Sequence, residues 1–140
     1  MTATFQAVGI PTSLVSPEAA SAADRRYIKN QKTNGSAPTV VTNGVRTHGC
    51  EQLIVVIQLP DAGTSLDYTV YVWDHVAEVW CIAQAATSVA VAASPARAVV
   101  PIYGAMKVAV LLNNFSGTFT TGANVWLSDN GRMDNGTGSE

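Results

Sequence analysis

Charge is the scarcest property of this sequence. Only 13% of its 140 residues are charged, whereas ordinary soluble domains carry roughly 25%. No basic patch is present, since Arg25 and Arg26 are the only adjacent cations, so we expect no nucleic-acid binding by phosphate neutralisation. Dispersed monomers usually keep more surface charge. We therefore expect much of this surface to be covered in an assembly; the alternative is a neutral surface rich in alanine and threonine.

Cysteines and long apolar runs are also few. Cys50 and Cys81 are the only cysteines, and no apolar run reaches the length of a membrane span. The first residues lack a cationic lead-in and are interrupted by Pro11, which is a poor match to a signal peptide. The sequence therefore predicts no membrane association and two reduced, buried thiols.

A catalytic signature is missing as well. Asp74, His75 and Glu78 form the one local cluster of metal-ligand types, and the ordinary interpretation is a solvated turn. Metal binding would need a further ligand at matched geometry, and His48 is the only other histidine. No G-x-S-x-G context is present, so a hydrolase with His75 as its base ranks last among our hypotheses. We predict a protein that is not an enzyme, with no catalytic residue, cofactor or metal.

The strongest structural signal is a β-hairpin over residues 66–82. Residues 67–73 and 78–83 are rich in Tyr, Thr, Val and Trp, which suit a pleated surface, and a short polar turn joins them. Successive side chains of a strand point to opposite faces. One face would carry Tyr68, Val70 and Val72, and the other Thr69, Tyr71 and Trp73. Because both faces are apolar, we expect the domain core on one side and a second layer or a partner on the other.

Short strand signals separated by turns fill most of the remaining chain. We predict strands within residues 39–42, 45–50, 51–59, 84–96, 97–103, 106–112 and 124–128, with 51–59 central and 84–96 weak. Pro101 interrupts 97–103, which indicates an edge strand or a bulge. In 106–112 the alternation places Met106, Val108, Val110 and Leu112 inside. Residues 113–122 would be a hairpin loop. The expected fold is all-β, an antiparallel β-sandwich or jelly-roll-like barrel.

The first third of the chain reads differently. Residues 1–15 predict an extended arm, and Ser16-Pro17 predicts the start of a short helix that ends near residues 27–30. We therefore divide the chain into an arm with a short helix (1–36), a β-sandwich domain (37–129) and a tail (130–140). Apolar side chains of the arm and exposed aromatic residues of the sandwich are candidates for an interface. They are Phe5, Ile10, Leu14, Tyr27, Tyr71, Trp73, Phe115 and Phe119.

The order of the strand signals supports a resemblance. An N-terminal arm precedes L-I-V-V-I-Q-L, D-Y-T-V-Y-V-W-D, E-V-W-C-I, M-K-V-A-V-L-L-N and N-V-W-L-S, over residues 39–128. This succession resembles the small β-sandwich structural proteins of tailed bacteriophage virions, in particular head decoration (cement) proteins. The resemblance implies a trimeric or otherwise symmetric homo-oligomer that clamps junctions between major capsid subunits, anchored by its arm. It implies localisation in the virion, after assembly in the host cytoplasm.

Three functional hypotheses remain open. The first is a non-enzymatic virion structural protein, most simply a capsid decoration protein. The second is a neck, tail or fibre-base component of a virion, which the same surface would serve. The third is a carbohydrate-binding module, because Trp73, Trp80 and Trp126 could stack on sugar rings.

Overall fold

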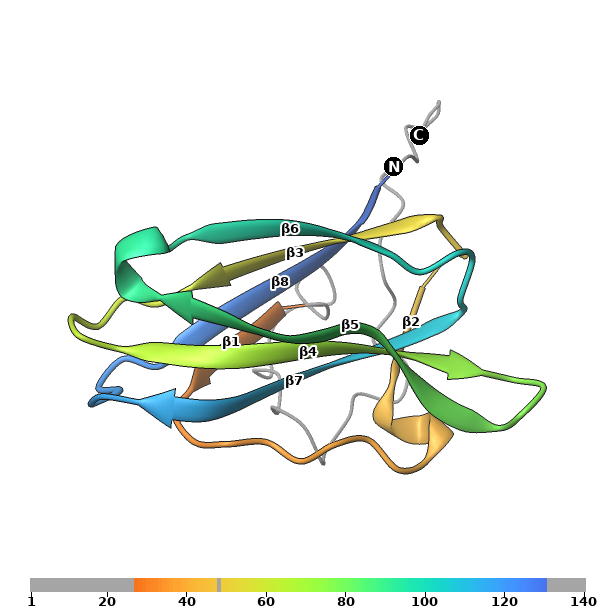
Figure 1. Cartoon of the computed structure of the whole chain (residues 1–140), viewed down its shortest axis with the longest axis horizontal. Helices are drawn as coiled ribbons and strands as arrows, with labels where there is room; N and C mark the ends of the chain where they lie inside the picture. Colours follow the sequence, from red (N-terminus) through yellow and green to blue (C-terminus); the bar gives the residue numbers. More distant parts are fainter. Residues whose placement is uncertain (1–26, 48, 131–140) are drawn as a thin grey trace.

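Two antiparallel β-sheets packed face to face make up the protein in a computed structural model, which describes residues 27–47 and 49–130 (Figure 1). The strands are β1 (Tyr27–Gln31), β2 (Val45–Arg46), β3 (Gln52–Gln58), β4 (Ser65–Asp74), β5 (Val79–Ala90), β6 (Ala96–Pro101), β7 (Lys107–Ser116) and β8 (Ala123–Asn130). Two short 3-10 helices, η2 (Val41–Asn43) and η3 (Val91–Ala93), are the helices of the described residues. The expected all-β sandwich is confirmed.

The strand order identifies the topology. One sheet has the order β1-β8-β3-β6 and the other β2-β7-β4-β5, and all paired strands are antiparallel. First and last strands pair, as do second and seventh, third and sixth, and fourth and fifth, which is the nesting of a jelly roll. The predicted central strand over 51–59 is β3, between β8 and β6, and Pro101 lies in an edge strand as expected.

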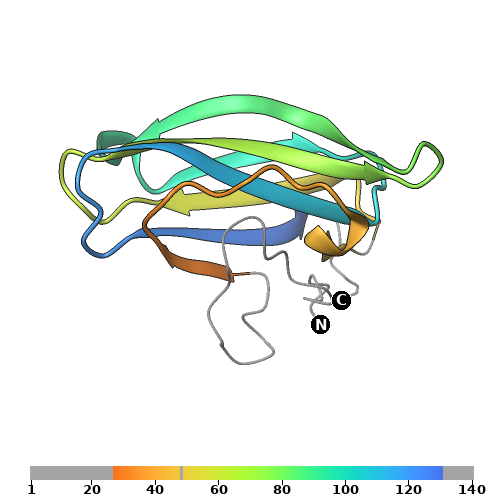
Figure 2. The same ribbon diagram turned by 90° about the horizontal axis from the view of Figure 1, so that it is seen from below.

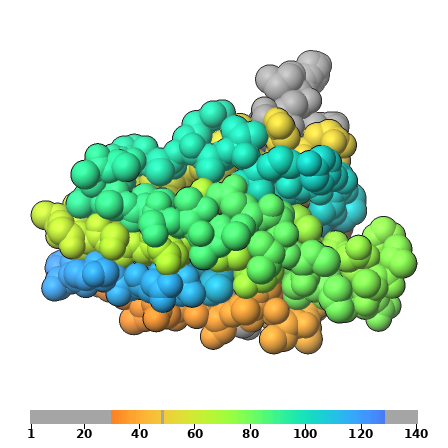
Figure 3. Space-filling view, in the orientation of Figure 1, coloured from red at the N-terminus to blue at the C-terminus, as the bar shows by residue number. Residues whose placement is uncertain are grey.

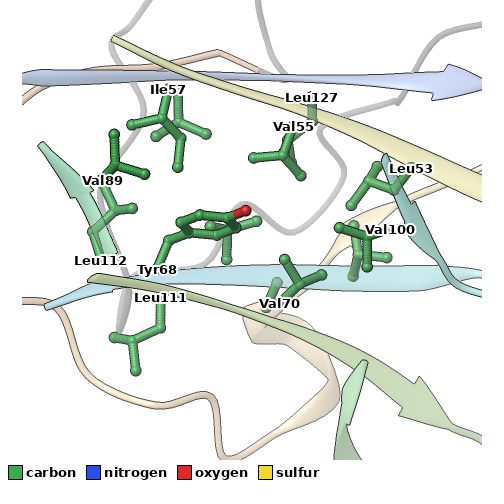
Figure 4. Close-up of a cluster of buried hydrophobic side chains, with 14 of the residues drawn as sticks. Leu53, Val55, Ile57, Tyr68, Val70, Val89, Val100, Leu111, Leu112 and Leu127 are labelled. Atoms are coloured by element: carbon green, nitrogen blue, oxygen red, sulfur yellow. The ribbon is translucent and has the colours of Figure 1, made fainter. Parts of the chain in front are cut away.

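The inward faces of both sheets form one apolar core. Leu53, Val55 and Ile57 of β3 face Tyr68 and Val70 of β4 across the layer, and all five are at most 4% exposed (Figure 4). The alternation predicted for β7 is confirmed at Val108, Val110 and Leu112. Period-two alternation therefore located the core strands correctly, because one face of each strand must leave water.

The sequence prediction fails at several places outside the core strands. The strand predicted over residues 45–50 ends at Arg46, and residues 113–116, predicted as part of a loop, continue β7. Tyr27–Gln31 form β1, paired with β8, so the predicted helix is wrong at its end; its other residues, 16–26, lie outside the described range. The strand predicted over residues 39–42 is wrong. Asn43 Oδ1 accepts the N–H groups of Thr39 and Val40 at 2.8 and 3.0 Å, and these bonds fold the chain into η2.

Two further differences concern strand ends. Beyond residue 83, β5 continues along β4 to Ala90 as one strand rather than a weak strand in a loop. Met106 precedes β7 and is 57% exposed.

Residues 32–44, which we call the strap, run along the edge of the hairpin sheet formed by β7. The strap runs beside β7 (Figure 2), where Gly35 N donates to Leu112 O at 2.9 Å and Phe115 N donates to Asn34 Oδ1 at 3.2 Å. Leu111 points away from the core towards this side of the sheet, and it is only 7% exposed (Figure 4). The strap also reaches the outer face near the hairpin tip, where Trp80 Nε1 donates to Val40 O, so the chain itself covers a small part of the face where a second layer was expected.

Candidate functional site

The tip of the β4–β5 hairpin extends beyond the body of the sandwich (Figures 1 and 3). Asp74 Oδ1 accepts the N–H groups of Val76 and Ala77, both at 2.9 Å, and Glu78 N donates to Asp74 O at 2.8 Å. The N–H groups of Ala77 and Val76 lower the pKa of the Asp74 carboxyl, because they stabilise its charged form. This carboxylate fixes a turn in which Val76 is 82% exposed.

A groove of about 450 Å³ lies between the hairpin tip and the β6–β7 loop. Val72 and Cys81 line it from the hairpin, and Ile102, Tyr103 and Met106 line it from the loop. The loop is held in place by backbone bonds, in which the N–H groups of residues 102 and 103 donate to Glu51 O at 2.9 and 3.1 Å. Its wall is therefore mostly apolar and anchored to the start of β3.

A second groove of about 580 Å³ lies on the outer side of the hairpin, between its tip and the strap. Trp73 and Trp80 pack edge to face there, with ring centroids 5.4 Å apart and an interplanar angle of 69°. Trp80 Nε1 donates to Val40 O of the strap at 3.0 Å. The indole N–H of Trp80 is therefore already used in holding the strap, and the two rings do not form one flat platform.

Exposed apolar side chains concentrate at this end of the molecule. Among the described residues, seven large apolar side chains are exposed, and five of them belong to the hairpin tip or the adjoining loop. We call these five the tip surface: Val76 (82%), Val79 (48%), Ile82 (60%), Tyr103 (80%) and Met106 (57%). Single exposed apolar residues are normal, but a group of them at one end of a protein makes that end the candidate interaction site.

The interface residues predicted from the sequence do not gather on this surface. Phe5, Ile10 and Leu14 lie outside the described residues, and Tyr27 lies in β1, paired with Trp126 of β8. Tyr71, Trp73 and Phe115 are half-buried, and Tyr71 and Phe115 pack against the edge of the core. Phe119 is 9% exposed and packs in the core, 4.7 Å from the ring of Phe115, so its ring offers little to a partner.

The other chemical candidates are dispersed. His75 and Glu78 lie in the exposed turn beside Asp74, while the position of His48 is outside the described residues. No group of three potential metal ligands occurs within residues 27–47 and 49–130. Trp126 lies in the sheet opposite Trp73 and Trp80, so the three tryptophans do not share a surface. Cys50 is buried as predicted, but Cys81 is exposed, because the tip half of β5 extends past the core.

None of the five residues of the tip surface is among the interface candidates predicted from the sequence. Val79 and Ile82 lie in the predicted hairpin, and the other three lie outside its strands. Met106 fits the alternation of the following strand, and Tyr103 fits the strand before it, so both read as strand positions. The sequence signal that could have located Tyr103 and Met106 in a loop is the pair Pro101 and Gly104, because proline and glycine often end a strand and begin a turn. Val76 was overlooked as a turn residue, although an apolar side chain at the centre of a short turn is unusual.

Comparison with protein-family models, curated proteins and solved structures gives no match for this chain. Across the part of the chain that the structure describes, no helix has the length and apolar character needed to cross a membrane.

Proposed function

We propose that this protein is a non-enzymatic structural subunit of a virion, with capsid decoration as its first candidate role. The observation that carries the proposal is the tip surface, a group of exposed apolar side chains on a projecting hairpin. Protein–protein interfaces are depleted of charge at their centres and enriched in aromatic residues and methionine. The tip surface has this composition, with Tyr103 and Met106 beside three aliphatic residues.

The fold is compatible with this role without selecting it. Double-sheet jelly rolls occur in viral capsid domains and also in lectins, so the choice must come from the surface. A sugar site needs exposed ring faces with convergent polar groups. Trp73 and Trp80 instead meet edge to face, and the N–H of Trp80 is bonded to the strap. These features favour a protein partner over a glycan.

Low charge supports the same proposal. The chain carries eight basic and ten acidic residues in 140, a net charge of −2. A subunit bound at many equivalent positions of a particle gains avidity from repeated weak contacts. Such a subunit needs neither a deep pocket nor a strongly charged surface, and the open, apolar groove under the hairpin suits shallow docking.

The test is co-sedimentation with empty particles assembled from the major capsid protein of the same genome. We expect saturable binding of the purified full-length protein. Val76→Asp should weaken it by roughly tenfold or more, since a charge would enter an apolar contact. Ala62→Asp is the matched control, because Ala62 is exposed in the β3–β4 loop at the opposite end of the sandwich (Figure 1).

Each other outcome points elsewhere. Wild-type protein that stays in the supernatant at every concentration would contradict capsid decoration. Density located on the neck or tail of intact particles would instead support the second virion role. Retardation on a glycan gel that is lost in Trp73→Ala would support a carbohydrate-binding module.

A further inference from the structure

Strand β5 ends the sheet β2-β7-β4-β5, and its outer edge is unpaired in the described chain. It is also the longest strand, with 12 residues. An exposed strand edge presents a row of free N–H and C=O groups, which can pair with another strand. Proteins normally protect such edges with charges, proline, bulges or covering segments.

β5 lacks most of this protection. Its sequence, V-W-C-I-A-Q-A-A-T-S-V-A, holds no charged residue, proline or glycine. The edge strand of the other sheet on this side, β6, carries Arg97 and Pro101. The opposite edge of the hairpin sheet, formed by β7 at this position, is covered by the strap through the bond from Gly35 N to Leu112 O. Of these three edges, β5 alone is both uncovered and uncharged.

Bulges divide β5 into two halves. The register with β4 shifts on both sides of Val70, which leaves extra residues between positions 82 and 87 of β5. Residues 79–82 pair regularly with residues 71–74 of β4, and residues 87–90 pair regularly with residues 65–68. Only the tip half carries large exposed apolar side chains, Val79 at 48% and Ile82 at 60%. The tip half is therefore the better template for a further strand.

We infer that the tip half of β5 is the interface between two copies of this chain, which pair antiparallel across a twofold axis at Cys81. Self-pairing sets each residue against another residue of the same segment, so a charge on the axis would meet its own copy and a charge beside the axis would enter an apolar contact. Residues 79–83 contain none. With the axis at Cys81, Trp80 lies beside Ile82 of the second copy, and Val79 lies beside Ala83. Both pairs join apolar side chains, and the exposed Ile82 becomes covered. Val76, Tyr103 and Met106 of the tip surface lie outside the paired segment, so they are not used up by this pairing.

The nearest alternative registers are less favourable. A twofold axis normal to a continuous sheet preserves its faces, so the axis must pass through a residue position, and the neighbouring positions are Ile82 and Trp80. An axis at Ile82 would place the Trp80 indole beside the polar Gln84 rather than beside Ile82. The other candidate is an axis at Trp80. That axis would place Ile82 beside the Glu78 carboxylate of the second copy and set two indole rings opposite each other. The Cys81 register instead places Glu78 beside Gln84, whose amide can donate a hydrogen bond.

This arrangement makes Cys81 a reporter of the register. Directly opposed residues of an antiparallel pair have Cα atoms about 4.5–5.5 Å apart, within the range that a disulfide spans. Diamide oxidises two thiols to a disulfide by taking two electrons and two protons, and is itself reduced to the hydrazine. Cys81 is exposed and Cys50 is buried, so diamide should select Cys81.

The experiment combines cross-linking with mass measurement on the full chain. Sedimentation velocity under reducing conditions should give a dimer, and diamide should convert most of it to a covalent dimer. Cys81→Ser should abolish the covalent dimer, and Cys50→Ser should retain it. Ile82→Asp should raise the dimer dissociation constant by roughly tenfold or more, since symmetry brings two carboxylates into one interface.

A matched control separates pairing from a general effect of charge. Val99→Asp makes the same kind of change in β6, at a side chain that is 41% exposed, and should leave the dimer intact. A monomer at every concentration, or a dimer unaffected by Ile82→Asp, would overturn the inference. A dimer in which diamide never links Cys81 would overturn the register. These results do not depend on capsid particles, so they are distinguishable from failure of the proposed function.

Discussion

Gly117 offers a sharp test of how the loops at the end opposite the hairpin tip pack together. It lies between β7 and β8 at φ +92°, and a Cβ there would collide with the carbonyl oxygen of Gly63 and lie 3.1 Å from Thr64 Cα. Both neighbours are backbone, which cannot swing away as a side chain can. Gly117→Ala must therefore displace the β3–β4 loop or the β7–β8 loop.

Gly104 provides the matched comparison. Its φ is +80°, but a Cβ there would meet only Gly49 O, at an ordinary 3.7 Å. Both alanine variants carry the strain of a left-handed conformation, about 1–2 kcal/mol. Gly117→Ala adds the cost of forced overpacking, typically about 1–3 kcal/mol. The difference between the two variants isolates the steric term.

The assay is urea unfolding followed by tryptophan fluorescence, with free energies compared at a common slope. We expect Gly117→Ala to lose at least about 1 kcal/mol more stability than Gly104→Ala. Equal losses would refute the reasoning, because they would mean that the two loops are not in contact through Gly117 in solution.

Three further predictions concern the core, the arm and acid stability. Val110→Asp, at a site 1% exposed, places an unpaired charge in the core and should prevent folding; a soluble variant with native circular dichroism would show that the strand phase is wrong. Deleting residues 1–15 should preserve a cooperative thermal transition but weaken co-sedimentation with particles, whereas loss of folding would place the arm in the core. Hydrogen bonds from Ser88 and Asn114 lower the pKa of Asp67. Its small, solvent-screened stabilising effect is therefore present above about pH 4 and is lost as pH falls through the lowered pKa. Asp67→Asn should shift the urea midpoint at neutral pH but not in acid.

The core and the fold class followed from local pattern. Alternation of apolar residues predicted β3, β4 and most of β7, because a strand in a sandwich must turn one face away from water. The proline of β6 marked an edge for an equally local reason, the missing N–H. The hairpin was recognisable because β-branched and aromatic residues flank a short polar turn.

The failures share one cause, which is dependence on distant partners. Tyr27–Gln31 follow residues with helical signals, yet they form a strand because β8 offers an edge about 100 residues away in the sequence. β5 continues past residue 83 because β4 is long enough to pair with it, although its Ala- and Ser-rich sequence has weak strand propensity.

The candidate site depended on tertiary structure even more strongly. The sequence by itself determined a sparsely charged chain, an all-β architecture and an apolar hairpin with two apolar faces. Only the tertiary structure decided that the strap runs along the edge of β7, that Met106 and Tyr103 meet the hairpin tip, and that β5 is an uncovered edge. The physical reason is that periodicity reports which side of a strand faces inward. Exposure at the end of a strand, by contrast, depends on where its neighbours stop.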